Sequence, residues 1–169
     1  MHEKHHQEML QIPRFKGWAN ENAIQINGLD ESSRIVRLEP GHKNMDSHYV
    51  TEILHNMTSE LGVLLNDHQK YHIYLAVYAG KIVGVCAAED SVMATKTGSV
   101  SQVRVGVQRL FVRPAFRRKG IAKAILKTIM LTHFKGQMLE TDDIAFSSPT
   151  DDGIKFVQSI TKRDVFYVY

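Results

Sequence analysis

The sequence predicts a mixed α/β domain of the α+β kind, whose central sheet is mostly antiparallel and carries helices on both faces. Two features motivate this prediction. Apolar runs at residues 71–78 and 81–88 are separated by Ala79-Gly80, a pair typical of the turn in a β-hairpin. Further along, an alternating strand over residues 103–113 leads through a basic, glycine-containing turn into a helical pattern over 118–134.

Length and composition agree with one globular domain. The chain has 169 residues, of which 43% are apolar and 23% charged. No apolar run approaches the length of a membrane span and no secretory segment follows Met1, so we expect no membrane partner. Cys86 is the only cysteine and lies in an apolar run, which predicts a small core residue in a reducing compartment.

The basic residues are clustered, although the net charge is only +3. Seven of them lie within one short stretch: Arg104, Arg109, Arg113, Arg117, Arg118, Lys119 and Lys123. This stretch lacks the interleaved aromatic residues and the recognition motifs of nucleic-acid-binding proteins. A phosphorylated cofactor explains the cluster more economically.

Two strands and a helix are expected before the hairpin. Residues 23–26 and 34–38 alternate as short strands. Apolar residues recur at helical spacing over residues 50–65 and predict a helix with one buried face. His68 and His72 follow with three residues between them, but no carboxylate accompanies this pair, so we expect a solvated loop there.

The second half of the chain supplies the remaining elements. Residues 90–101 are small and polar, which predicts a loop before the strand at 103–113. After the helix over 118–134 and a connection over 136–142 we expect a strand at 143–147, a helix at 151–160 and a closing strand at 165–169.

The turn between the strand and the helix at 118–134 has the chemistry of an anion site. A helix N-terminus leaves backbone N–H groups unpaired and carries the positive end of the helix dipole. Gly120 lets a ligand approach the backbone, and Ala122 keeps the start of the helix narrow. The expected ligand is a pyrophosphate. The alternative is a solvated basic turn before an ordinary amphipathic helix.

The pattern Arg117-x-x-Gly120-x-Ala122 after a strand resembles the coenzyme A signature of the GCN5-related N-acetyltransferases, the GNAT superfamily. The stretch over residues 143–153, with its Ala-Phe-Ser-Ser-Pro-Thr-Asp-Asp-Gly run, and the closing residues 165–169 resemble one branch, the Eco/ESCO-type acetyltransferases that modify cohesin. In that family Gly-x-Ser-Arg-Ile-Trp-Val precedes the basic turn, and here Gly106-Val-Gln-Arg-Leu-Phe-Val112 does.

The resemblance implies a GNAT fold and acetyl-CoA as cofactor. It assigns three groups of residues to that cofactor: the backbone of Leu110, Phe111 and Val112 to the acetyl and pantetheine arm; Arg117, Arg118, Lys119, Gly120, Ile121, Ala122 and Lys123 to the pyrophosphate; and Thr150, Asp151 and Asp152 to the other side of the pantetheine.

The resemblance also implies a protein lysine N-acetyltransferase that acts on the ATPase head of a cohesin SMC-class subunit. Cohesin-associated factors would be its partners, and the nucleus, on chromatin, its location. Two alternatives remain: a catalytically weak relative that binds acetyl-CoA or a partner, and an acetyltransferase for a small amine or a ribosomal protein.

The catalytic base is the point at which the chain departs from this family. Gln108 stands where many members carry Ser, and Ser148 where many carry Asp; neither side chain can act as a base near neutral pH. Glu89, after the strand at 81–88, lies at the expected mouth of the cleft and is the candidate base. Glu89 as a solvated strand end, another carboxylate (Asp142, Asp143 or Asp151) and a chain of waters are the alternatives.

His2 and His6 open the chain in an H-E-x-x-H pattern. A zincin site is excluded by its place at the N-terminus without a third ligand. The family resemblance instead implies the second half of a two-Cys, two-His zinc finger, which could hold zinc only with cysteines upstream of Met1. We therefore expect residues 1–17 to be a finger remnant, or else a disordered polar start, and residues 18–169 to be the acetyltransferase domain.

Overall fold

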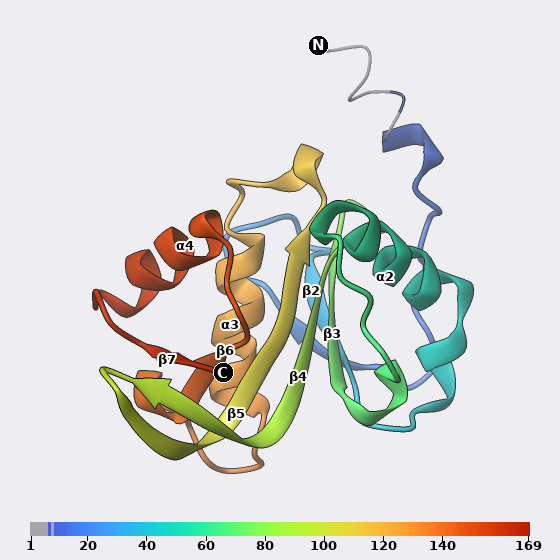
Figure 1. Ribbon diagram of the computed structural model, residues 1–169. Coiled ribbons are helices and arrows are strands. Elements are labelled where there is room, and N and C mark those ends of the chain that lie inside the picture. Colours follow the sequence, from blue (N-terminus) through green and yellow to red (C-terminus); the bar gives the residue numbers. More distant parts are fainter. Residues whose placement is uncertain (1–6, 8) are drawn as a thin grey trace.

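A seven-stranded sheet organises the part of the chain that the computed structural model describes, residues 7 and 9–169 (Figure 1). Its strands are β1 (Asn22–Gln25), β2 (Arg34–Leu38), β3 (His72–Tyr78), β4 (Lys81–Lys96), β5 (Ser99–Val112), β6 (Ile144–Phe146) and β7 (Tyr167–Val168). Helices α2 (His48–Leu61), α3 (Ile121–Thr132) and α4 (Asp151–Thr161) pack with it.

The strands lie side by side in sequence order, β1 to β7. Neighbours from β1 to β5 are antiparallel, whereas β6 runs parallel to both β5 and β7. Helices α3 and α4 make the two parallel connections, since a parallel pair needs a crossover. The predicted mostly antiparallel mixed sheet is confirmed.

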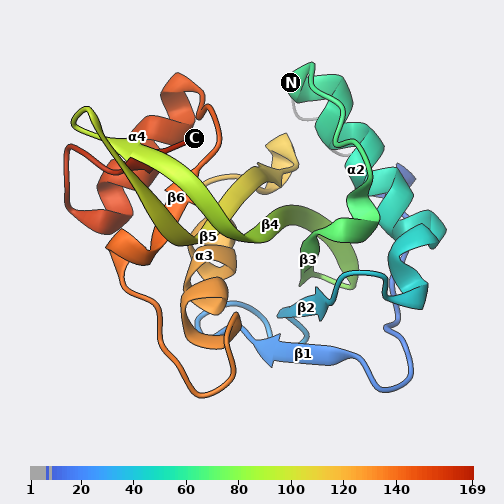
Figure 2. The same cartoon turned by 60° about the horizontal axis from the view of Figure 1, so that its bottom comes forward.

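Helices cover both faces of the sheet, as Figures 1 and 2 show. The side chains of β3 are divided between two cores, because alternate residues of a strand point to opposite faces of the sheet. Ile73 and Leu75 pack in the core beneath α2, with Val50, Ile53 and Met57 of that helix. Tyr74 and Ala76 pack in the core beneath α3, with Ile121, Ile125 and Ile129, and this core also includes Val157 of α4.

The prediction of a loop at residues 90–101 is wrong. β4 and β5 instead continue as one long hairpin that turns at Thr97-Gly98, both in the left-handed region. Val92, Ala94 and Val103 alternate inward and form a third small core with Ala145, against which β7 packs. The alternation was present in the sequence, but small polar residues on the outer face obscured it.

Three smaller differences concern where elements begin and end. The helix predicted over 50–65 stops at Leu61, because Gly62 takes a left-handed conformation with φ of 68°. The closing strand is confined to residues 167–168. His68 does lie in a short 3-10 turn, but the loop expected at His72 is wrong, since His72 begins β3 and is buried.

The segment before residue 18 contributes to both large cores, Ile12 to the core beneath α3 and Phe15 to the core beneath α2. Ile12 and Phe15 are buried, and the Phe15 N–H donates to the carbonyl of Gly80. His2 and His6 lie outside the described residues, so the finger remnant over residues 1–17 stays a prediction.

Candidate functional site

Strands β5 and β6 part beyond Val107. The last ladder pair is Val107 with Phe146, followed by one bond from the Ser147 N–H to the Val107 carbonyl at 3.0 Å. Past this point the chain after β6 turns away toward α4, while β5 continues to Val112 with β4 on its other side. Residues 108–112 therefore have a backbone edge without a strand partner on the β6 side.

A bulge at Gln108 determines which peptide groups line that edge. Ala87 pairs with Arg109 and Ala88 with Val107, so Gln108 has no partner on β4. The bulge also changes which side chains face α3: Val107 belongs to that core before it, and Leu110 and Val112 pack there after it.

The bonds between β5 and β4 show which way the peptide groups after the bulge point. The Arg113 N–H donates to the Val83 carbonyl at 2.8 Å, so the peptide groups of Arg113 face β4. Because successive peptide groups of a strand point to opposite sides, those of Val112 and Leu110 face the free edge. These are two of the three residues that the sequence assigned to the pantetheine arm.

The basic turn ends in an open helix start. Gly120 has φ of 80° and is the N-cap of α3, with no side chain capping the helix and no acidic residue in its first turn. The N–H groups of Ile121, Ala122 and Lys123 therefore lack an intrahelical acceptor. Arg118, Lys119 and Lys123 are exposed around them. This arrangement has the donors and the charge of an anion site.

Arg117 is held differently from its basic neighbours. Its Nε donates to the Val112 carbonyl at 2.8 Å, and its Nη2 pairs with Glu60 of α2. The guanidinium also lies 5.9 Å from the centre of the Phe111 ring. Arg117 thus braces the turn against β5 and α2, whereas the sequence assigned it only to the pyrophosphate.

The opposite wall begins at the end of β6. The Thr150 hydroxyl accepts from the Gly153 N–H at 3.2 Å and caps α4, so it is already engaged. Asp151 and Asp152 are exposed in the first turn of that helix. Their negative charge suits contact with a neutral amide-bearing arm better than contact with phosphate.

Glu89 lies in the middle of β4 and is not a strand end. It pairs across the ladder with Gly106, and its Oε1 accepts from the Tyr169 hydroxyl at 2.9 Å. Gly106 makes this contact possible, because a Cβ there would lie 2.5 Å from the Tyr169 hydroxyl. Burial is the main cause that raises the pKa of Tyr169, and the neighbouring Glu89 is the second. The phenol therefore stays protonated and donates a hydrogen bond to the carboxylate.

Gln108 and Ser148 flank the point where β5 and β6 part. The Gln108 Oε1 accepts from Arg109 Nη1 at 2.8 Å, and the same nitrogen reaches Ser147 Oγ at 3.3 Å. The Ser148 N–H donates to the Tyr169 carbonyl at 3.2 Å. Gln108 is thus held by a cation, and Ser148 is exposed.

The sequence missed Tyr169, Arg109 and Ser147 as parts of this site. Arg109 was visible as a member of the basic cluster. The contact between Tyr169 and Glu89 spans eighty positions along the chain and has no local signature.

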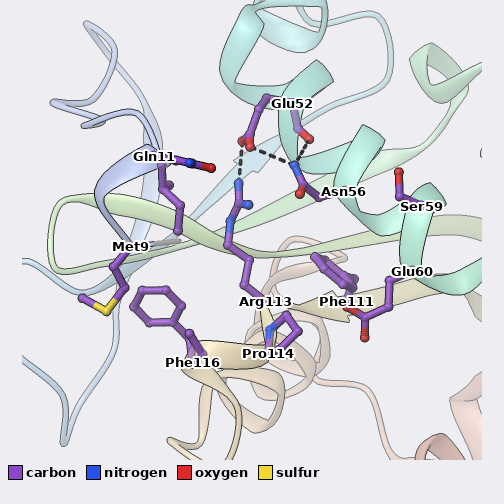
Figure 3. Close-up of a pocket in the computed structure, with 12 residues that line it drawn as sticks. Met9, Gln11, Glu52, Asn56, Ser59, Glu60, Phe111, Arg113, Pro114 and Phe116 are labelled. Carbon is purple, nitrogen blue, oxygen red and sulfur yellow. Dashed lines mark hydrogen bonds and ion pairs between the residues drawn. The ribbon is translucent and has the colours of Figure 1, made fainter. Parts of the chain in front are cut away.

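A cavity of about 400 Å³ lies on the α2 side of the sheet (Figure 3). The end of β5, the following turn and the segment near Met9 enclose it together with α2. Glu52 is its polar centre: its carboxylate pairs with Arg113 Nη2 at 2.5 Å and accepts from Asn56 Nδ2 at 2.8 Å. Its lining residues are Met9, Gln11, Ile12, Glu52, Asn56, Ser59, Glu60, Phe111, Arg113, Pro114, Ala115 and Phe116.

Of the predicted cofactor residues, Phe111 alone lines this cavity. Glu52, Asn56 and Glu60 are spaced four residues apart on α2, so one helix face carries them. That spacing was the available sequence signal for this side of the site.

Comparisons with known proteins bear on this geometry. Residues 101–169 match the model of the ESCO1/2 acetyl-transferase family. The chain is 28% identical over 181 residues to N-acetyltransferase eco of Drosophila melanogaster, covering 100% of this chain and 17% of that protein. It is 26% identical over 194 residues to human N-acetyltransferase ESCO2, covering 99% of this chain and 32% of that protein. The chain thus spans less than a third of either relative.

Solved structures show the same similarity. The xEco2 acetyltransferase domain superposes with a TM-score of 0.80 at 25% identity, over 90% of this chain and 98% of that one. The same domain bound to a coenzyme A conjugate gives 0.79 at 26% identity, over 89% and 98%. An aminoglycoside acetyltransferase from a soil metagenomic sample shares the fold alone, with a TM-score of 0.52 at 15% identity, over 76% and 86%.

Over the described residues, no helix combines the length and the apolar character needed to cross a bilayer.

Proposed function

The chain belongs to the Eco/ESCO-type acetyltransferase family within the GNAT superfamily, and on this premise we propose that it transfers the acetyl group of acetyl-CoA to a lysine of a protein. One observation carries the proposal: two backbone surfaces adjoin each other, the edge of β5 at residues 108–112 that no strand covers and the uncapped start of α3 at Gly120. The first can bind the amide-bearing arm of a cofactor and the second its pyrophosphate.

The residues present fit coenzyme A. The N–H groups of Ile121, Ala122 and Lys123 would donate to the pyrophosphate, and nothing lies within 4 Å of the position that a Cβ would take at Gly120. The peptide groups of Leu110 and the N–H of Val112 would hold the pantetheine arm, since the Val112 carbonyl is bonded to Arg117, and Thr150, Asp151 and Asp152 would lie on its other side. When bound, acetyl-CoA supplies the activated thioester.

Glu89 would accept the proton of the acceptor lysine. A free lysine has a pKa of ~10.4, so its amine carries a proton near pH 7 and must lose it before attack. The Tyr169 hydroxyl donates to one oxygen of Glu89, which orients the carboxylate and leaves its remaining lone pairs as acceptors.

The other carboxylates that the sequence offered as bases are less suitable. Asp142 is bonded at 2.7 Å to both Lys96 and Arg163, which lower its pKa. Asp143 is occupied by a capping interaction with the Glu140 N–H at 2.8 Å. Asp151 is exposed at the start of α4. Glu89 is therefore the base that we propose.

The acceptor that we propose is a lysine on the ATPase head of a cohesin SMC-class subunit. The supports are the Eco and ESCO2 names of the relatives and the family match. Association with cohesin factors and a nuclear, chromatin-bound location belong to the same proposal.

The test of the substrate is mass spectrometry of isolated SMC heads incubated with this protein and acetyl-CoA. We expect acetylation at one or a few lysines of the head and none when Glu89 is replaced by Gln. Equal, scattered acetylation of unrelated proteins would contradict a specific head as acceptor.

The test of the base is the turnover of Glu89→Gln. We expect a loss of about 10²–10⁴-fold with acetyl-CoA affinity unchanged in calorimetry. Asp142→Asn is the matched control, because it removes a carboxylate that cations already hold, and it should keep its turnover. Near-normal activity of Glu89→Gln would give Glu89 a structural role.

A weakly active relative is the second candidate function, and Gln108 with Ser148 favours it, since neither can act as a base. Ser148→Asp separates the two candidates. An unchanged or lower rate supports full activity through Glu89, whereas a higher rate supports a chain that has lost its base.

A further inference from the structure

Two histidines and an aspartate converge at the end of α3, far along the chain from one another. His72 begins β3, Asp90 belongs to β4, and His133 follows the last residue of α3. One ligand atom from each of the three lies within 4.8 Å of the others. His133 Nε2 is 2.6 Å from Asp90 Oδ1, and His72 Nε2 is 3.3 Å from the same oxygen.

The cluster is built into the core on one side and open on the other. The side chain of His133 is fully buried and that of His72 is 10% exposed, whereas the side chain of Asp90 is 54% exposed. An ion among the three would therefore be reached from the side of Asp90, where a water molecule can complete its coordination.

The remaining ring nitrogens have partners that orient them. His72 Nδ1 lies 2.9 Å from Glu39 Oε2, and His133 Nδ1 lies 2.8 Å from the Tyr74 hydroxyl. A carboxylate or hydroxyl behind the second nitrogen of a metal-binding histidine is the usual support of such a ligand. The sequence predicted a solvated loop at His72 because no carboxylate lies between His68 and His72; the fold supplies Glu39 and Asp90 from other strands.

The contacts of His72 direct its Nε2 atom toward Asp90. Glu39 Oε2 lies 2.9 Å from Nδ1 on the other side of the ring. Arg37 Nη2 also approaches Nδ1, but at 3.3 Å, and it pairs with Glu39. The Nε2 atoms of His72 and His133 therefore converge on the same oxygen of Asp90.

We propose that His72 Nε2, His133 Nε2 and Asp90 Oδ1 bind one zinc ion at the C-terminal end of α3. Two ligands of a tetrahedral zinc lie about 3.3 Å apart when each is about 2.0–2.1 Å from the metal. His72 Nε2 and Asp90 Oδ1 have this spacing, whereas His133 Nε2 lies 2.6 Å from Asp90 Oδ1, so the exposed Asp90 carboxylate must move outward by a few tenths of an ångström to admit the ion. Two imidazoles and one carboxylate are ligands that zinc accepts. Tyr74 can accept as well as donate, so it supports the His133 tautomer that binding needs.

The site shares no residue with the cofactor site or with the finger half-site predicted at His2 and His6. It lies at the opposite end of a twelve-residue helix from Gly120, a length of about 18 Å. Its role would be structural: the ion would join the end of α3 to β3 and β4, and the zinc-bound protein would resist unfolding more than the zinc-free protein.

The experiment is zinc titration of the full chain in which His2, His5 and His6 are replaced by Ala, so that the N-terminal histidines do not contribute. We expect one equivalent of Zn²⁺ in calorimetry, visible absorption bands of four-coordinate Co²⁺ when cobalt replaces zinc, and a higher thermal midpoint with either ion.

Two variants make the assignment specific. Asp90→Asn removes an exposed ligand without opening a cavity and should weaken zinc binding at least ~10-fold in a folded protein. Asp46→Asn is the matched control, since Asp46 pairs with His68 at 3.1 Å on the surface, and it should bind zinc as the parent does. No binding by the parent, or equal binding by Asp90→Asn, would overturn the proposal.

Discussion

The two ends of α3 are built in opposite ways. At its start, Gly120 leaves the first N–H groups without a cap, and the surrounding side chains are exposed and basic. At its end, Arg37 donates to the carbonyls of Thr132 and His133, and the His133 ring is enclosed by Tyr74, His72 and Asp90. One helix thus combines an end with open donors and an end whose acceptors are satisfied.

This difference shows how the helix can present a ligand site without losing its own position. A helix terminus that keeps its donors free for a ligand gives up the stabilisation of a capping side chain. The interactions at the other terminus can offset that loss, because they anchor the helix to β2, β3 and β4. Changes at the two ends should therefore separate binding from stability.

The largest effect is expected at the enclosed end. Arg37→Ala removes the donor to both carbonyls and leaves Glu39 without its cation, and the side chain is only 9% exposed. We expect a loss of about 3–5 kcal/mol in the free energy of unfolding, measured by urea denaturation of the metal-free protein. Acetyl-CoA affinity of the folded fraction should be unchanged. If Arg37→Ala lost affinity for acetyl-CoA but kept its full stability, the enclosed end of α3 would serve binding and not stability, contrary to the prediction.

The next effect is expected at the open end. Gly120→Asp should weaken acetyl-CoA binding by about 100-fold or more in calorimetry, since a carboxylate would repel the pyrophosphate. Gly120→Asn is the matched control, because asparagine has the same shape and also tolerates the left-handed region. It should bind more tightly than the Asp variant. Equal affinity of the two would remove charge as the reason.

Helix α4 provides an intermediate case, since its start is capped by Thr150. Thr150→Ala should lower the free energy of unfolding by about 1 kcal/mol, because the Gly153 N–H loses its acceptor. A substitution at a capped start thus changes stability through the lost capping bond, whereas the uncapped start of α3 has no such bond to lose. Thermal denaturation of Thr150→Ala and Thr150→Ser gives the comparison, with the Ser variant close to the parent.

The smallest effect is expected at an exposed ion pair. Asp142 is bonded to Lys96 and Arg163, which lower its pKa below the usual 3.8. A lowered carboxyl pKa stabilises the fold above that value, and the contribution disappears as pH falls through the folded pKa. Arg163→Ala should change stability by about 0–1 kcal/mol at pH 7, and by less as the pH falls toward 2 and Asp142 takes up its proton. A larger change at pH 2 would contradict the pairing.

The start of α3 could be predicted because its determinants are contiguous. The pattern around Gly120 lies within one short stretch, and local backbone chemistry sets its conformation. The strand before it was also predicted, although the bulge at Gln108 was not, since no residue type there marks an extra position in the ladder.

The end of α3 could not be predicted in this way. Arg37, His72, Asp90 and His133 come from four separate elements, and three-dimensional pairing alone brings them together. The long hairpin was missed for a related reason: its inward residues Val92 and Ala94 are recognisable as core only once β7 and β6 are placed against them. The part of the site that the sequence did not predict is formed by contacts between elements that are distant along the chain.

The bulge at Gln108 gives this strand one spare position. Val107 pairs with Ala88 and Arg109 with Ala87, so deletion of Gln108 would leave two consecutive ladder pairs, and Leu110, Phe111 and Val112 would keep their faces and partners. Insertion of one residue between Arg109 and Val112 would have the opposite result: it would move Phe111 to the other face of the sheet and turn the Val112 carbonyl away from Arg117. This segment can therefore lose one residue more easily than it can gain one.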